Sequence, residues 1–259
     1  MLLITSPRFE EHTTPPGHPE RPDRAHVFDA VAARWRERGG RTVAPRPATV
    51  EELARVHDET YIESIQKTTA RAVALDPDTF TSPESYEIAR LAAGAAVQAV
   101  EYALDRGEPA FALVRPPGHH AERDRAMGFC LFNNAAVAAA AALARGLSRV
   151  AIADIDVHHG NGTQWIFYDE PRVLYVSTHQ YPFYPGTGAA GEVGRGAGEG
   201  CTVNVPLEAG ASDQDYGRVY AALAAVIGAY APELLIVSAG FDAHEADPLA
   251  SMRMTAAGY

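Results

Sequence analysis

Cysteine is scarce in this sequence of 259 residues, where only Cys130 and Cys201 occur. Two cysteines cannot build the disulfide framework that holds small secreted proteins together. We therefore expect both thiols to be reduced and the protein to be cytoplasmic. The opening run Met1–Ile4 is short, has no basic flank and is soon followed by Pro7, so it does not fit a secretory signal peptide.

Long hydrophobic runs are also missing. The longest, from Ala135 to Ala144, is too short to cross a bilayer, which takes about 20 apolar residues in a helix. We expect no membrane association.

Basic residues are also few. The sequence has 22 Lys and Arg but 33 Asp and Glu, so the formal net charge is −11. A protein that binds the phosphate backbone of a nucleic acid needs a basic surface, so we predict no nucleic-acid partner. An acidic surface suits a cationic small molecule or a basic peptide better. Lys67 is the only lysine, a bias that indicates a GC-rich genome more than a function.

The remaining composition, with 47% hydrophobic and 21% charged residues, is that of a folded globular protein. From about residue 84 onward, helix-period segments alternate with short β-branched runs, which predicts an α/β fold with a parallel sheet. No internal repeat or long linker marks a boundary, so we expect one domain over residues 1–259. The expected strands are 110–115, 149–156, 172–179, 201–207 and 233–241, and the expected helices are 23–38, 50–67, 85–106, 133–145, 163–168 and 213–230.

Two segments are expected to be loops. Four prolines fall within residues 13–22, and seven glycines fall within residues 185–200. Loops of this kind carry function more often than the elements they connect. We expect residues 13–24 and 185–200 to form part of a rim that selects the substrate.

Five of the ten histidines come directly after expected strands. In an open parallel sheet, the ligand crevice lies outside the carboxyl ends of the strands. Any one of these polar residues could be a turn former or a helix cap, but a turn or cap role does not account for three such clusters. They are His119-His120, Asp154 to Gly162, and Asp242 to His244.

The second and third clusters predict a metal site. Asp156 and His158 lie two residues apart on an expected strand, so both side chains project on one face, and Asp242 can approach from another strand. Oxygen and nitrogen ligands without a thiolate favour a catalytic Zn²⁺, or alternatively Fe²⁺. Such a metal activates water and polarises a carbonyl, which leaves a proton shuttle to be supplied, and His119 and His120 are the candidates.

These motifs resemble the zinc-dependent histone deacetylase family, including its acetylpolyamine amidohydrolase-like and acetoin-utilisation members. The resemblance covers residues 12–259 and implies a three-layer arginase/deacetylase-like fold, in which helices flank a central, mostly parallel sheet. Its most specific segments are Pro116 to Ala121, Gly128 to Cys130, Asp154 to Gly162, Ala239 to His244 and Asp247-Pro248.

The resemblance also implies a role for each site residue. Asp156, His158 and Asp242 are similar to the family's metal ligands. His120 corresponds to the general base and acid, and His119 to its electrostatic partner.

Further residues of the resemblance support these groups. Asp154 corresponds to the partner of His119, and Asn161 stands where many relatives have an Asp that partners His120. An Asn cannot share a proton as an Asp can, so His120 should be less basic here. The family's acyl-lysine tunnel implies substrate-binding roles for Gly128, Phe129 and Tyr184, and its structural potassium site implies K⁺ near Asp154, Ser177 and His179.

A binuclear arginase-like manganese hydrolase shares this fold class and must be weighed. Those enzymes need a further Asp two residues after each ligand pair, where this chain has Gly160 and His244. One metal is the better prediction.

One family feature lies beyond the given sequence. A Gly-Gly-Tyr segment supplies an oxyanion donor in the family, and Tyr259 lies too near Asp242 to take its place. We therefore expect the last strand and helices to be lacking, whether the chain is a fragment, a natural truncation or a protein that a partner completes.

Three hypotheses about function follow. The first is a hydrolase that removes acetyl or other short acyl groups from lysine side chains or polyamine-like amines. The second is a weak or inactive acyl-amine-binding module, and the third is a decayed site without metal. The expected partner is an acylated lysine peptide or a small acylated amine, and a homo-oligomer is left open.

Overall fold

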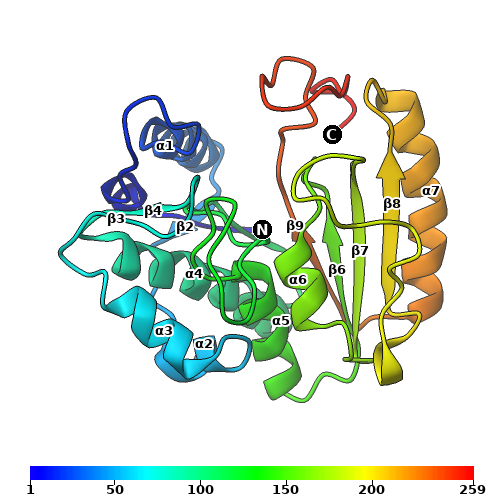
Figure 1. The fold of residues 1–259 in the computed structure, drawn as a ribbon, viewed down its shortest axis with the longest axis horizontal. Coiled ribbons are helices and arrows are strands. Elements are labelled where there is room, and N and C mark those ends of the chain that lie inside the picture. Colours follow the sequence, from blue (N-terminus) through cyan, green and yellow to red (C-terminus); the bar gives the residue numbers. More distant parts are fainter. The chain divides into compact units, whose positions relative to one another are not determined.

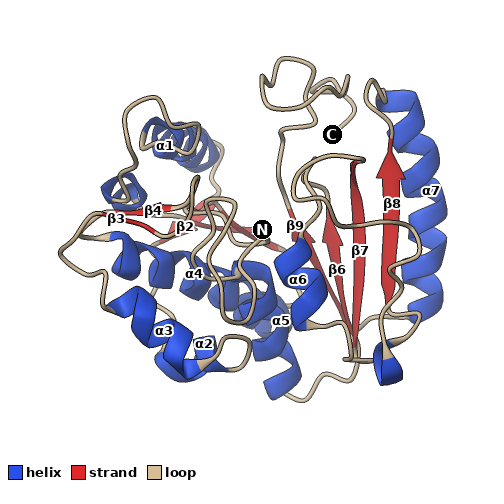
Figure 2. Ribbon diagram, viewed as in Figure 1, coloured by secondary structure: helices blue, strands red, loops and turns tan.

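The computed structural model describes all 259 residues, which form two compact units, Met1–Ala142 and Leu143–Tyr259. Both units combine parallel strands with helices (Figures 1 and 2), which confirms the predicted α/β class. None of the helices is both long and apolar enough to span a membrane.

The first unit is built on a three-stranded parallel sheet in the order β2-β1-β5. A small antiparallel pair, β3 with β4, accompanies it. The helix predicted for residues 50–67 is wrong as one element, because it is interrupted before Asp58, whose backbone is extended. The elements are β1 Leu2–Ile4, η1 Pro7–Glu11, α1 Asp23–Glu37, β2 Arg41–Val43, α2 Val50–Ala54, α3 Glu59–Gln66, β3 Val73–Ala74, β4 Phe80–Thr81, α4 Ser85–Arg106, β5 Ala110–Ala112 and α5 Asn134–Ala144.

Strand β1 organises the core of the first unit by its period of two. Leu2 and Ile4 pack with Ala95 of α4, whereas Leu3 packs with Ala32 of α1. Successive side chains of a strand point to opposite faces of the sheet, so helix α4 packs against one face of β1 and helix α1 against the other. Sequence patterning did not reveal β1, because three residues are too few to show a period.

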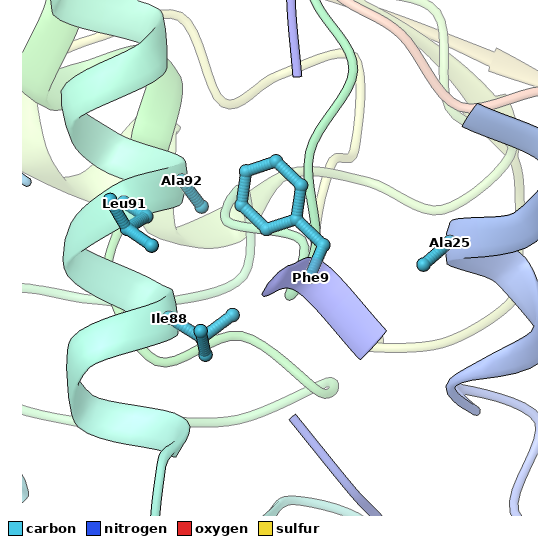
Figure 3. Packing of buried hydrophobic residues seen from close by; sticks show 5 residues of the cluster. All are labelled: Phe9, Ala25, Ile88, Leu91 and Ala92. Atoms are coloured by element: carbon cyan, nitrogen blue, oxygen red, sulfur yellow. The ribbon is translucent and has the colours of Figure 1, made fainter. Parts of the chain in front are cut away.

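Helix α4 contributes a second cluster through residues spaced three and four apart. Ile88, Leu91 and Ala92 lie on one face and contact Phe9 of η1, whose side chain is fully buried (Figure 3). The helix ends as predicted at Gly107, which adopts φ +64°, a left-handed conformation that glycine takes without strain.

The second unit contains a four-stranded parallel sheet in the order β8-β7-β6-β9. Helix α7 runs along this sheet (Figure 1) and packs Leu223 against Leu174 and Val176. The predicted helix 213–230 is confirmed to the residue. The elements are β6 Val150–Asp154, α6 Asn161–Ile166, β7 Val173–Gln180, η2 Gly196–Gly198, β8 Thr202–Leu207, α7 Asp213–Tyr230 and β9 Leu234–Ser238.

The two apolar strands β7 and β9 differ in burial. All eight residues of β7 are buried, as its central position requires. Strand β9 lies at the edge of the sheet, and its Leu235 and Val237 are 47% and 52% exposed. An apolar run alone does not distinguish an edge strand from a central one.

Candidate metal centre and histidine loop

The metal-ligand candidates lie after two neighbouring parallel strands of the second unit. Asp154 of β6 pairs with Ser238 of β9, so both strands end at the same level. Asp156 and His158 follow the first strand and Asp242 follows the second. The register therefore brings together residues that are more than 80 positions apart in sequence.

The strand prediction for residues 149–156 was too long. Strand β6 ends at Asp154, and Asp156 and His158 lie in a bend rather than on the strand. The backbone N–H of Asp156 donates to Asp154 Oδ1 at 3.3 Å, and the N–H of His158 donates to Asp156 Oδ1 at 2.8 Å. These local bonds, not strand periodicity, direct the two side chains to the same place.

Asp156, His158 and Asp242 form a compact cluster. Their ligand atoms all lie within 4.8 Å of one another, and the chain has no other such group of three His, Cys, Asp or Glu side chains. His158 Nδ1 lies 3.1 Å from Asp156 Oδ1 and 3.0 Å from Asp242 Oδ2. The N–H of Val157 donates to Asp242 Oδ1 at 2.9 Å and anchors the third ligand.

The electrostatics of this cluster favour a cation. Burial alone would lower the pKa of His158, but hydrogen bonds to Asp156 and Asp242, together with their charges, raise it to about 10. Burial and the charge of Asp156 raise the pKa of Asp242 to about 6. Two carboxylates this close need positive charge between them, and an Asp₂His donor set fits Zn²⁺ or Fe²⁺.

The predicted histidine pair lies in the first unit, in the loop that follows β5. His119 and His120 are buried, and their ring centroids are 4.0 Å apart. Gly128 packs so closely on His120 that a Cβ there would overlap the His120 ring. The structure thus places Gly128 against His120, and β5, which precedes their loop, belongs to a different sheet from β6 and β9.

The two predicted aromatic walls lie in different units. Phe129 adopts φ +68°, is partly buried, and its N–H donates to Thr79 Oγ1 at 3.1 Å. Tyr184 is 37% exposed and meets the His158 ring edge-on at 6.1 Å. Sequence reasoning missed Phe183, which stacks on His158 at 5.3 Å with an interplanar angle of 19°. Its place in the aromatic and proline run 181–185 was the available signal.

The supporting residues are placed as follows. Asp154 is buried and accepts from the Tyr175 hydroxyl at 3.2 Å. Asn161 is buried at the first residue of α6. Ser177 pairs in register with Asp154, and its hydroxyl lies 2.9 Å from His179 Nδ1. The roles predicted for these residues stay predictions.

A family model described as the histone deacetylase domain matches residues 18–259. The chain belongs to the histone deacetylase family. This confirms the resemblance found in the sequence, and it makes the protein a deacetylase-family hydrolase. Deacetylases of this family are typically zinc-dependent, which agrees with the donor set of the cluster.

Individual members of the histone deacetylase family resemble the chain over nearly its whole length. A probable deacetylase of Archaeoglobus fulgidus is 40% identical over 99% of this chain and 73% of its own length. Histone deacetylase 15 of Arabidopsis thaliana is 44% identical over 99% of this chain and 48% of its own. The crystal structure of the HDA15 HD domain superposes with a TM-score of 0.94 at 41% identity, covering all of this chain and 76% of that one.

Proposed function

We propose that the protein is a zinc-dependent hydrolase that removes acetyl or other short acyl groups from lysine side chains or polyamine-like amines. The observation that carries this proposal is the Asp156–His158–Asp242 cluster, whose ligand atoms lie within 4.8 Å of one another. A cluster of two carboxylates and one imidazole leaves coordination positions open, as a catalytic zinc requires. The side chains keep 16–19% of their surface exposed, so a solute can reach them.

Asp156, His158 and Asp242 would hold the metal. A bound Zn²⁺ supplies polarisation of the amide carbonyl and a lowered pKa for water. Hydrolysis of the amide also requires a group that moves one proton from water to the departing amine.

We assign this proton transfer to His120. One ring nitrogen accepts the proton from the attacking water and passes it to the amine nitrogen as the amide C–N bond breaks. His119 lies against His120 and supports its charge, with Asp154 and Asn161 as the proposed partners of the pair. Burial of both rings keeps them in defined orientations.

The proposed substrate contacts are aromatic. Phe129 and Tyr184 would flank the aliphatic stem of an acyl-lysine or acyl-polyamine, and Gly128, whose backbone lies against the His120 ring, would line the same tunnel. The net charge of −11 suits a cationic substrate in either case. We also propose a structural K⁺ near Asp154, Ser177 and His179, and a cytoplasmic setting, which two unbonded cysteines suit.

The test combines elemental analysis with turnover of a fluorogenic acetyl-lysine amide. We expect one zinc per chain and measurable hydrolysis in the wild type. Asp242→Ala should lose metal and turnover together, whereas His120→Ala should keep the metal and lose turnover. Glu245→Gln is the matched control, because its exposed carboxyl lies near Asp242 in sequence but outside the cluster.

The outcomes separate the alternatives. Full turnover in Asp242→Ala would refute the metal site. Tight binding of a zinc-chelating hydroxamate without turnover would favour the acyl-amine-binding module, and iron in place of zinc would correct the metal.

A further inference from the structure

The loop that carries His119 and His120 is tied to the start of helix α5 by one buried side chain. Asn133 Nδ2 donates to the carbonyl of Ala121 at 3.1 Å and to that of His119 at 3.5 Å. Its Oδ1 accepts from the N–H of Ala136 at 3.0 Å and so caps α5. Because the oxygen is committed to the helix, the amide group must face the histidine loop.

His57 in turn fixes the backbone of Asn133. The N–H of Asn133 donates to His57 Nε2 at 2.9 Å, and His57 Nδ1 lies 2.8 Å from the carbonyl of Glu122. A backbone N–H only donates and a carbonyl only accepts. His57 therefore carries its proton on Nδ1, keeps Nε2 free as an acceptor, and is neutral.

Packing holds the His57 ring in place. It is 1% exposed and lies 5.4 Å from the ring of Tyr61 and 5.5 Å from that of Phe132. The Tyr61 hydroxyl donates to the carbonyl of Leu131 at 2.5 Å. Burial lowers the pKa of His57 to about 4, in keeping with a neutral ring. Residues 131–133 are thus restrained at consecutive positions.

Helix α5 adds a second tie to the same loop. Asn134 Nδ2 donates to the carbonyl of Pro116 at 3.2 Å, and a Cβ at Gly118 would press on the backbone of Asn134 and Phe132. The loop from residue 116 to 121 therefore rests on the segment that His57 holds.

We propose that His57 and Asn133 are a positioning pair, which sets the orientation of the His119 and His120 rings through the backbone of their loop. Neither residue touches the reacting atoms. The inference rests on the proposed function, in which His120 moves the proton. Loss of the pair should misdirect that proton transfer, because catalytic geometry tolerates displacements of only about 0.5 Å.

The test uses the full chain with four substitutions. Asn133→Asp keeps the cap of α5 but removes the donor to His119 and Ala121. His57→Asn removes the acceptor for the Asn133 N–H, whereas His57→Gln places an acceptor near the position of Nε2 and is the conservative variant. His26→Gln, at an exposed position of α1, is the matched control.

Two measurements are made on each protein. Histidine side-chain ¹H–¹⁵N NMR spectra report the tautomer and environment of the His119 and His120 rings, and steady-state kinetics separate kcat from KM. We expect Asn133→Asp and His57→Asn to shift both ring signals and to lower kcat at least about tenfold, with KM and zinc affinity unchanged. His57→Gln should recover most of the loss, and His26→Gln should match the wild type.

A lower unfolding temperature with unchanged ring signals and unchanged kcat would overturn the proposal, because the pair would then serve folding alone. Absence of turnover in the wild type would instead refute the proposed function. The NMR signals of His119 and His120 would still decide the positioning role in that case.

Discussion

At the scale of single residues, Gly240 shows how closely the candidate metal ligands are packed. Gly240 lies two residues after the end of β9, and a Cβ there would overlap the Asp156 side chain, so the chain can pass this close to that carboxylate because the residue is glycine. The absence of a side chain here is therefore part of the geometry of the cluster.

We predict that Gly240→Ala weakens zinc binding at least about tenfold, because the added methyl group moves the Asp156 carboxylate away from His158 and Asp242. Zinc affinity measured by competition with a chromophoric chelator checks this. Gly217→Ala is the control, since a Cβ at that position of α7 meets nothing within 4 Å. Equal affinities in the two variants would contradict the expectation.

The burial of His57 also predicts how the stability of the protein depends on pH. Its ordinary pKa of 6.5 is lowered to about 4 in the folded protein, chiefly by burial. As the pH falls below 6.5, His57 is protonated in the unfolded chain, whereas in the folded chain it stays neutral down to about pH 4. The free energy of unfolding therefore falls between these two pH values. The shift corresponds to about 3 kcal/mol.

Denaturant unfolding at pH 4.5 and pH 7 should therefore show a smaller loss of stability in His57→Gln than in the wild type, although the variant is less stable at pH 7. The His26→Gln variant should keep the full pH dependence, because His26 is 64% exposed. Parallel curves for wild type and His57→Gln would disprove the assignment.

At the scale of elements, the carboxylate of Glu192 is one of the groups that hold the glycine-rich segment 185–200, together with hydrogen bonds of His159 to Thr187 and of His179 to Gly188. Glu192 accepts from the backbone N–H of Gly188 at 3.1 Å and of Ala189 at 3.2 Å, and from Gln164 Nε2 at 2.6 Å. The sequence left open whether this loop is compact or mobile. The structure shows that it is compact and tied to α6.

We predict that Glu192→Ala loosens this loop and costs about 1–3 kcal/mol, because several donors lose their acceptor. Hydrogen exchange at Gly188 and Ala189 should accelerate while β7 stays protected. Glu199→Ala, an exposed carboxylate of the same loop, should change neither quantity. Unaltered exchange at Gly188 and Ala189 in Glu192→Ala would show that this carboxylate does not restrain the loop.

At the scale of the whole molecule, a metal held by Asp156, His158 and Asp242 would link the loop after β6 to the loop after β9. Both loops belong to the second unit, so ligation would stabilise that unit directly. A ligand that binds only the folded state adds about 2.7 kcal/mol when its free concentration is about 100 times Kd.

Removal of zinc with EDTA should therefore lower the unfolding temperature, and readdition should restore it. Hydrogen exchange after metal removal should rise first in residues 155–160 and 239–247. Asp242→Ala should be insensitive to zinc and EDTA alike. A wild-type unfolding temperature that ignores EDTA would count against a metal in the cluster.

Several features were predictable from sequence for a physical reason. Helices 85–106 and 213–230 are long enough for the helical spacing of their apolar residues to be recognised, and local caps such as Gly107 mark their ends. The identities of Asp156, His158 and Asp242 limit the ligand chemistry before any fold is known, since side-chain donors are properties of residues. Apolar runs indicated the strands after residue 84 in the same way.

Other features were decided only by tertiary structure. Strand pairing is non-local, so the short strands β1 to β4, the edge position of β9 and the meeting of Asp242 with His158 depend on register rather than on pattern. The role of His57 emerged only when its two ring nitrogens met a specific donor and acceptor. The sequence by itself determined the fold class, the family and the ligand types, because these follow from residue identity and period. Tertiary structure determined which of those residues share a site and what holds them there, because distances between remote residues exist only after folding.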